Sequence, residues 1–319
     1  MTVAELRPGL FRVEEPDGGR RLCQAVVAGE QRTLVVDAGL PESPGRGLLP
    51  LLSSMGLDRR PVVLVLTHPD ADHRGGAPVL RDALPKLEVW GHELDREQLS
   101  DPEVALAKRY LAFAASDGLG PAPDRLEAMR SRLGRRVRLD RALTDDTTLD
   151  LGGRRAEILH TPGHSPGSVV AWLPEERAAL IADAAMSRGI PFEDGSLMYP
   201  PMYAPPGAYL DTIARLEALG PSLIISGHEP PLEGPEAAHF LVASREAAHL
   251  LSLLVRAALG PRPRTLAELC SAVADSYGNL SPHATTSLAM TVDGVLQDLV
   301  AGGQAEVESG PPRSFRTAG

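Results

Sequence analysis

The chain has 319 residues, of which 43% are hydrophobic and 23% are charged, so it is long enough for one large folded domain and a smaller one. Its 32 Lys and Arg residues against 42 Asp and Glu residues give a formal charge of −10. This balance argues against nucleic acid as a partner, because phosphate backbones are bound through basic residues. Two cysteines, Cys23 and Cys270, lie too far apart for a metal or redox motif, which excludes a disulfide scaffold and favours a reducing, cytoplasmic compartment.

Targeting and membrane-spanning patterns are not expected in this chain. Residues 1–8 lack the basic and apolar regions of a signal peptide. The longest apolar runs, such as residues 61–66, have the length of a strand and fall far short of the ~20 residues that cross a bilayer. We therefore expect no membrane association.

The first ninety residues predict a set of strands with two helices between them. Strands are expected at residues 10–13, 22–28, 33–36, 61–66 and 87–90, and helices at residues 45–55 and 77–84. The run 61–66 (Pro-Val-Val-Leu-Val-Leu) is apolar throughout, which is the pattern of a strand covered on both faces. Residues 61–90 thus predict a unit of strand, loop, helix and strand.

The rest of the chain predicts a second strand-rich half and then a helical tail. Helices are expected at residues 102–133 (interrupted at 117–121), 208–219 and 235–259, strands at 147–151, 154–159, 168–173, 178–182 and 222–225, and an ordered loop at 187–207. The sequence Pro-Arg-Pro-Arg at 261–264 indicates a boundary between a domain of residues 1–260 and a smaller unit of residues 261–319. In that unit, helices are expected at 265–277 and 282–301, and a hairpin at 305–308 and 314–316. The pattern as a whole predicts an α/β sandwich with a small helical appendage.

The strongest chemical signal is the run His-Pro-Asp-Ala-Asp-His, which follows the buried strand directly. It holds four potential metal ligands, His68, Asp70, Asp72 and His73. A loop at the carboxyl end of a strand can direct several side chains into one crevice, because the sheet holds its base. Taken alone, the same residues also fit a solvated polar turn that caps the next helix.

Three later positions favour the metal interpretation. His164 lies in the turn-rich segment 161–168, Asp183 follows an apolar strand, and His228 follows another. Each of these residues stands where a strand meets a loop, which is where ligands of a shared crevice are expected. Nitrogen and oxygen donors of this kind suit two divalent ions.

In this order, these residues resemble the metallo-β-lactamase-fold hydrolase superfamily. The pattern of that superfamily is His-x-His-x-Asp-His, then a histidine in a Thr-Pro-Gly-His-Ser-Pro-Gly-Ser-like turn, then an aspartate and a further histidine. The Asp-Ala-Gly strand end at 37–39 and the full turn at 161–168 are similar to the glyoxalase II and lactonase-like branches. The resemblance implies a four-layer αββα sandwich over about residues 1–260, followed by a winged-helix-like appendage.

Carried over residue by residue, the resemblance implies two divalent ions, with zinc as the first expectation and Mn or Fe as alternatives. One ion would be held by His68, Asp70 and His164 and the other by Asp72, His73 and His228, with Asp183 bridging them. A metal-bound hydroxide would attack the carbonyl carbon of the substrate. Asp72 would be the catalytic residue, since it would orient that hydroxide.

Asp70 departs from the superfamily pattern, which has a histidine at this position. With three ionised aspartates and one hydroxide against two divalent ions, the cluster would be formally neutral. We expect this to lower its Lewis acidity and to favour harder ions such as Mn²⁺ or Fe²⁺ more than usual. Some nuclease-like members of the superfamily share the departure, so it leaves the substrate class open.

Other polar residues near the predicted strand ends are weaker candidates. His160 fits a group that orients a ligand and a purely structural histidine about equally, and His92 could face the cleft. Tyr199, Tyr203 and Tyr209 could donate to a substrate carbonyl, but a loop stabilised by its own aromatic residues is the favoured interpretation.

These features predict a dinuclear metal hydrolase that cleaves an ester, thioester or lactone of a small-molecule acyl substrate. An apolar entrance suited to an acyl chain is expected from Met186, Phe192, Met198, Tyr199, Met202 and Tyr203. The alternatives are a phosphodiesterase or nuclease, which the acidic charge opposes, and a metal-binding protein without turnover, which the complete donor set opposes. Residues 261–319 carry four arginines against six acidic residues, so we expect them to serve packing, a lid or a homodimer contact rather than DNA binding.

Overall fold

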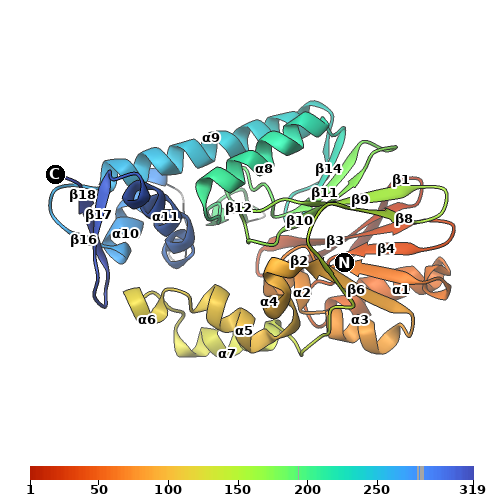
Figure 1. The fold of residues 1–319 in the computed structure, drawn as a ribbon. Coiled ribbons are helices and arrows are strands. Elements are labelled where there is room, and N and C mark those ends of the chain that lie inside the picture. Colours follow the sequence, from red (N-terminus) through yellow and green to blue (C-terminus); the bar gives the residue numbers. More distant parts are fainter. Residues whose placement is uncertain (193, 279, 281–283) are drawn as a thin grey trace.

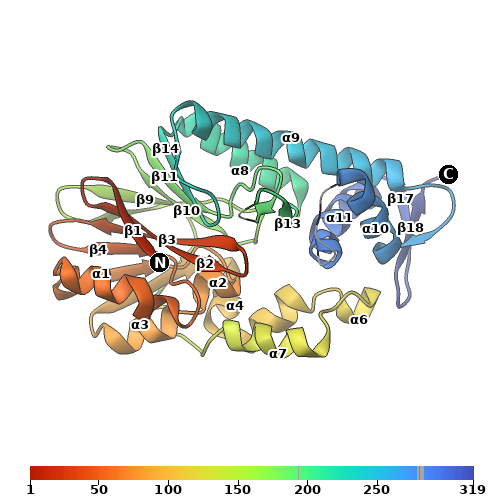
Figure 2. The same ribbon diagram turned by 180° about the vertical axis from the view of Figure 1, so that it is seen from behind.

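The structure of the chain is a computed structural model that describes residues 1–192, 194–278, 280 and 284–319. Two β-sheets lie face to face, with helices on both outer surfaces and a C-terminal unit at one end (Figures 1 and 2). Within the described ranges, no helix has both the length and the apolar character that a membrane span needs.

The first sheet has seven strands in the order β1-β2-β3-β4-β5-β6-β7. The strands are β1 (Thr2–Arg7), β2 (Leu10–Asp17), β3 (Arg20–Ala28), β4 (Thr33–Val36), β5 (Val62–Val65), β6 (Leu87–His92) and β7 (Arg141–Leu143). Neighbours from β1 to β4 are antiparallel, and neighbours from β4 to β7 are parallel. The carboxyl ends of β4, β5 and β6 therefore meet at one edge of the sheet.

The second sheet has six strands in the order β15-β14-β11-β10-β9-β8. The strands are β8 (Thr147–Asp150), β9 (Arg155–His160), β10 (Val169–Leu173), β11 (Ala178–Ala182), β14 (Leu223–Ser226) and β15 (Leu232–Glu233). Strands β11 and β14 are parallel, so their carboxyl ends also lie side by side.

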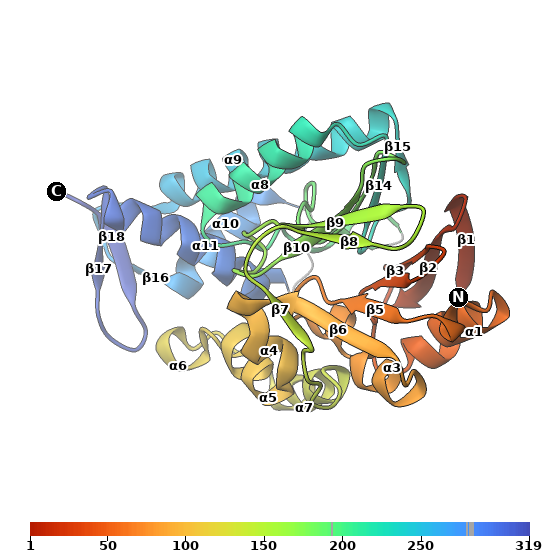
Figure 3. The same cartoon turned by 45° about the vertical axis from the view of Figure 1, so that its right-hand side comes forward.

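Each sheet is covered on both faces, which produces four layers. In β5, Val63 and Val65 pack between the sheets, whereas Val62 and Leu64 pack under the helices of the first sheet. These helices are η1 (Pro44–Leu48), α1 (Leu49–Ser54), η2 (Leu57–Arg59) and α3 (Ala77–Ala83), and the second sheet is covered by α8 (Pro206–Leu219) and α9 (Pro235–Ala258) (Figure 3). The predicted αββα sandwich is confirmed, and so is the prediction of a β5 strand buried on both faces.

A group of short helices connects β6 to β7. They are η3 (Glu93–Asp95), α4 (Arg96–Ser100), α5 (Pro102–Ala105), η4 (Leu106–Tyr110), α6 (Ala114–Asp117) and α7 (Pro123–Arg132). The fully buried side chain of Arg74 donates hydrogen bonds to the carbonyls of Leu99, Leu133 and Arg135 and so anchors this group to the core. The predicted interruption near residues 117–121 separates α6 from α7.

The C-terminal unit consists of two helices and a small three-stranded sheet. Its elements are β16 (Arg264–Thr265), α10 (Leu266–Tyr277), α11 (Ala284–Ala301), β17 (Ala305–Glu308) and β18 (Ser314–Thr317). The predicted start of the second helix, residue 282, lies outside the described residues. Apolar residues of α10 and α11 share one hydrophobic cluster with α8 and α9, so the unit packs continuously onto the second sheet's helices. The division at residues 260 and 261 and the winged-helix likeness stay predictions.

Several short elements are not expected from the sequence. Strand β1 is mostly exposed at the sheet edge, and α2 (Ala71–Arg74) is a single turn inside the metal-ligand motif. The segment 187–207, predicted as a loop, contains the two-stranded ribbon of β12 (Ile190–Pro191) and β13 (Leu197–Tyr199). Elements this short depend on their tertiary neighbours, because their own residues supply too little periodic pattern to define them.

Candidate metal centre

All seven predicted metal ligands lie where strands of the two sheets end. His68, Asp70, Asp72 and His73 follow β5, and the last two belong to the helical turn α2. His164 lies in the turn between β9 and β10, whereas Asp183 follows β11 and His228 follows β14. Because β11 and β14 are parallel, Asp183 and His228 emerge side by side.

The close packing of Asp183 against the His73 ring requires glycine at position 227. A Cβ atom there would lie 2.6 Å from Asp183 Oδ1 and 3.0 Å from a carbon of the His73 ring. Real Cβ atoms do not come as close as 2.6 Å, so any larger residue would push these side chains apart. The glycine of the Ser-Gly-His sequence is thus part of the site's construction.

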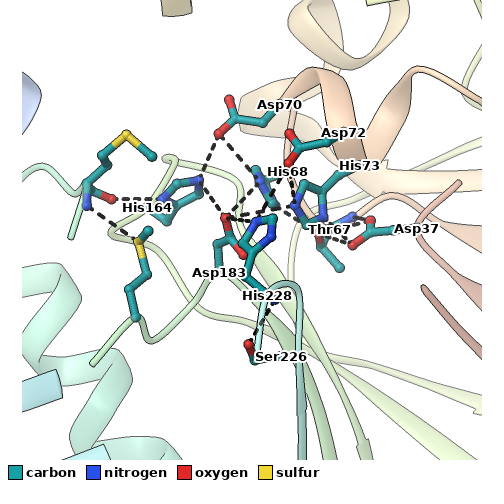
Figure 4. Close-up of polar contacts among 12 residues, drawn as sticks. Asp37, Thr67, His68, Asp70, Asp72, His73, His164, Asp183, Ser226 and His228 are labelled. Atoms are coloured by element: carbon teal, nitrogen blue, oxygen red, sulfur yellow. Dashed lines mark hydrogen bonds and ion pairs between the residues drawn. The ribbon is translucent and has the colours of Figure 1, made fainter. Parts of the chain in front are cut away.

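Asp183 is the centre of the cluster (Figure 4). Its Oδ2 atom lies 3.4 Å from the Nε2 atom of His228, 3.8 Å from that of His73, and 3.9 Å from those of His68 and His164. One carboxylate oxygen therefore faces four imidazole nitrogens, an arrangement that suits a bridging ligand.

The remaining two carboxylates divide the histidines into two groups. Asp70 Oδ2 lies 3.1 Å from His164 Nε2 and 3.6 Å from His68 Nε2. Asp72 Oδ2 lies 3.6 Å from His228 Nε2 and 3.9 Å from His73 Nε2. Tetrahedral ligands at about 2.0–2.2 Å from an ion are about 3.3–3.6 Å from one another, so both groups are close to this geometry.

The outer nitrogen of each histidine is held by an acceptor. His68 Nδ1 lies 2.9 Å from Thr67 Oγ1, and His73 Nδ1 lies 2.7 Å from Asp37 Oδ2. His164 Nδ1 lies 2.8 Å from the Met202 carbonyl, and His228 Nδ1 lies 2.8 Å from the Arg21 carbonyl. Thr67 Oγ1 donates to Asp37, so it accepts from His68. These contacts place a proton on each Nδ1 and leave Nε2 as the inward-facing nitrogen, which binds a metal ion when it carries no proton.

The inward nitrogens are the observation that tests whether metal fits. The Nε2 atoms of His68, His73 and His228 are buried and have no hydrogen-bond partner among the residues that the structure describes. Buried polar atoms are nearly always paired, so three such atoms facing one carboxylate oxygen fit divalent cations. The groups His68–His164–Asp183 and Asp72–His73–His228 each place their donor atoms within 4.8 Å of one another.

The pKa values of His68 and His73 are shifted in opposite directions from the ordinary value of histidine. Burial, with the neighbouring imidazoles, lowers the pKa of His68 to about 4, so this ring is neutral at pH 7. Burial alone would also lower the pKa of His73, but the surrounding carboxylates, Asp37 first, raise it to about 10. A metal ion bound to His73 would therefore replace a proton.

Residues 18–228 match the family model of the metallo-beta-lactamase superfamily, a range that contains all seven clustered residues. The chain belongs to this superfamily. Acyl-coenzyme A thioesterase MBLAC2 from Bos taurus is 27% identical over 223 residues, covering 66% of this chain and 73% of that protein. Hydroxyacylglutathione hydrolase from Ruegeria pomeroyi is 31% identical over 165 residues, covering 50% of this chain and 60% of that protein.

Solved structures of metallo-β-lactamase proteins share the fold. A metallo-β-lactamase family protein from Thermus thermophilus superposes with a TM-score of 0.71 at 23% identity, covering 98% of this chain and 100% of that one. A beta-lactamase domain protein from Burkholderia ambifaria gives a TM-score of 0.73 at 19% identity, covering 99% and 93% of the two chains. At these identities, the likeness concerns the fold alone.

Two buried arginines that lie outside the sequence motifs contact carboxylates of the cluster. Arg20 Nη2 lies 2.6 Å from Asp72 Oδ2, and Arg109 Nε and Nη2 lie 2.6 and 2.9 Å from the two oxygens of Asp70. Arg20 begins β3 and Arg109 comes from η4, so neither is near the motifs in sequence. Although burial alone raises the pKa of Asp72, the Arg20 guanidinium lowers it below its ordinary range.

The weaker candidates lie outside this cluster or border it. His160 stacks on His92 with ring centres 3.9 Å apart, and its Nε2 lies 2.9 Å from the Pro166 carbonyl, so it stabilises the turn that presents His164. Tyr203 and Tyr209 are fully buried and stack on each other in the hydrophobic core. The expectation that Tyr203 lines an entrance is therefore wrong, because its ring fills the core between α8 and the C-terminal helices. Tyr199 is half-buried, with its ring 5.7 Å from the Arg20 guanidinium.

Proposed function

We propose that this protein is a metal-dependent hydrolase that cleaves an acyl thioester. The observation that carries the proposal is the single Asp183 oxygen surrounded by four histidine Nε2 atoms at 3.4–3.9 Å. The thioesterase and acylglutathione hydrolase names of two relatives support a hydrolase and favour thioesters over other acyl substrates.

Seven side chains would hold two divalent ions. His68, Asp70 and His164 would bind one ion and Asp72, His73 and His228 the other, with Asp183 shared. When bound, such ions polarise a carbonyl oxygen and lower the pKa of water. Zinc is the first candidate, because nitrogen and oxygen donors in tetrahedral groups suit it, and Mn or Fe are the alternatives.

The buried arginines change the charge balance on which the sequence argument for harder ions depends. Arg20 and Arg109 each pair with one of the three carboxylates. Arg20 also pairs with Asp17, so its charge is shared, whereas the contacts of Arg109 with Asp70 directly reduce the negative charge that this carboxylate brings to the cluster. We therefore expect Lewis acidity to be higher than the Asp70 substitution alone predicts.

The chain's own groups would orient the reactants. Asp72 is held ionised by Arg20, and it would accept a hydrogen bond from the attacking water and direct the water's lone pair at the carbonyl carbon. Asp183 would hold the two groups of histidines in a fixed position relative to each other. The buried outer contacts of the four histidines hold the rings in place, so little reorganisation is required during the reaction.

The segment 187–207 is the proposed acyl entrance. Its Tyr199 ring lies over Arg20, which contacts Asp72, and its Met202 carbonyl holds His164. The segment thus borders both groups of ligands. Phe192 packs against the β2–β3 turn, where a Cβ on Gly19 would come within 3.1 Å of the ring. Apolar side chains in this segment suit an acyl chain better than a sugar phosphate.

A phosphodiester substrate receives less support. In the C-terminal unit, Arg313 pairs with Asp117 and Asp293, and Arg316 pairs with Glu306 and Glu308. Arginines already neutralised in this way are poor ligands for a phosphate backbone. We also propose that the substrate is a small acyl molecule, that nucleic acid is not a partner, and that the chain forms a homodimer in the cytoplasm.

The test is a substrate panel with metal-loaded protein. Acyl-CoA esters of increasing chain length, a lactone and a bis(aryl) phosphate are compared for turnover, with thiol release followed for the thioesters. We expect the highest kcat/KM on a thioester, and a loss of at least about 100-fold in the Asp183→Ala variant. Turnover confined to the phosphodiester, or thioester turnover that survives Asp183→Ala, would refute the proposal.

A further inference from the structure

The guanidinium of Arg109 lies directly at one of the two proposed metal groups. Its Nε and Nη2 atoms donate to both oxygens of Asp70, at 2.6 and 2.9 Å. Nη2 also lies 2.7 Å from His164 Nε2, the nitrogen on which an ion would bind. Arg109 therefore contacts two of the three residues that belong to this group alone.

The second group is different in this respect. Arg20 contacts Asp72 Oδ2, but within the described part of the chain the Nε2 atoms of His73 and His228 have no hydrogen-bond partner. In the first group, among the described residues, only His68 Nε2 lacks such a partner, because His164 Nε2 lies 2.7 Å from Arg109 Nη2 and 3.1 Å from Asp70 Oδ2. Two imidazole nitrogens of the second group and one of the first thus face the cluster without a hydrogen bond to any described residue.

We propose that Arg109 acts as an internal cation at the His68–Asp70–His164 group, so that the two groups bind metal unequally. The first ion binds at Asp72, His73 and His228 with Asp183. A second ion binds at the other group more weakly, because it must displace the Arg109 hydrogen bond from His164 and share Asp70 with a positive charge. This inference rests on the proposed metal-dependent function.

Contacts from elsewhere in the fold keep Arg109 in this position. Its Nη1 donates to the His164 carbonyl at 2.7 Å and lies 3.4 Å from the sulfur of Met290 on α11. The Arg109 side chain is only 8% exposed, so the guanidinium cannot exchange these partners for water without moving η4 or α11. Asp70 explains why a cation is tolerated here, since the histidine usual in the superfamily would offer Arg109 no carboxylate.

The experiment counts ions and requires no turnover. Metal-free protein, prepared with a chelator, is titrated with Zn²⁺ and separately with Mn²⁺ by calorimetry, and bound metal is measured by elemental analysis. For the unchanged chain we expect one tight equivalent and a second that binds at least about tenfold more weakly. In Arg109→Met the second equivalent should bind at least about tenfold more tightly, with the first unchanged.

Two further variants make the result specific. Arg20→Met removes the guanidinium at Asp72 and should change the affinity for the first ion but not the affinity for the second. Arg245→Met removes an arginine that pairs with Glu217 away from the centre and should alter neither. If circular dichroism shows that Arg109→Met does not fold, Arg109→Lys is used instead. Lysine cannot form the bidentate contact with Asp70, so the affinity for the second ion should then rise by a smaller factor.

Each outcome has a clear meaning. Two equally tight equivalents in the unchanged chain, or a second equivalent that Arg109→Met leaves the same or weakens, would overturn the inference and leave the proposed hydrolase intact. A chain that binds neither ion would overturn both. Unequal binding without thioester turnover would support the inference and count against the proposed function alone.

Discussion

Replacing Thr291 with valine is expected to loosen His164, a proposed metal ligand that lies on a different part of the chain. Thr291 is fully buried on α11, and its Oγ1 accepts from the Tyr203 amide at 3.1 Å and donates to the Pro201 carbonyl at 2.8 Å. Between these two residues, the Met202 carbonyl accepts the hydrogen bond of His164 Nδ1 at 2.8 Å. The hydroxyl therefore fixes the backbone that orients His164.

The size of the effect follows from the groups left unpaired. Valine keeps the shape of threonine but leaves one buried N–H and one buried C=O without this partner, and each such loss costs about 1–3 kcal/mol. We expect the variant to lose about 2–6 kcal/mol of unfolding free energy and the Tm to fall by about 3–9 °C. Because outer-contact changes weaken metal binding by about 10–100-fold, the affinity of the group that contains His164 should fall by at least about tenfold.

The assay combines thermal unfolding of the metal-free chain with calorimetric titration of Zn²⁺. The matched control is Thr33→Val, which removes one buried hydrogen bond from Thr33 to the Leu57 carbonyl, away from the centre. It should lower the Tm by less and leave both metal affinities unchanged. If Thr291→Val lowers the Tm but leaves both affinities at the control's values, then α11 packs against the site without positioning His164.

Three further changes have expected outcomes. Asp183→Asn removes the shared charge, so elemental analysis should find less than one ion per chain and turnover should fall at least about 100-fold; retention of two ions would contradict the bridging role. Burial raises the pKa of Glu15 above its ordinary value, so the contribution of this residue to stability is full below its unfolded pKa and is lost as the pH rises through its folded pKa. In denaturant unfolding, the stability of Glu15→Gln relative to the unchanged chain should therefore be higher at pH 7 than at pH 4. The exposed Glu127→Gln should show no such difference. Arg74→Met leaves three carbonyls without a donor and should cost about 3 kcal/mol or more, with early proteolysis in residues 93–135; wild-type protease resistance would refute that anchoring role.

The fold and the seven clustered residues could be predicted largely from local pattern. The apolar run that becomes β5 is buried on both faces, and each ligand candidate follows a strand, so the edge where strand ends meet could be inferred without coordinates. The superfamily match over residues 18–228 agrees with that reasoning. Short elements such as β1 and α2 could not be inferred, because their residues carry no clear periodicity.

What the sequence by itself determined is the order of donor types along the chain and the strands that carry them. Only the tertiary structure decided which charges accompany those donors. Arg20 and Arg109 lie far in sequence from the carboxylates that they contact, and Thr291 on a separate helix contacts the backbone on both sides of Met202, whose carbonyl contacts His164. Such contacts depend on long-range packing and on the loss of water around the charges, and neither leaves a periodic signal in the sequence. The donor types at the centre therefore follow from the motifs, whereas its charge balance follows from the fold.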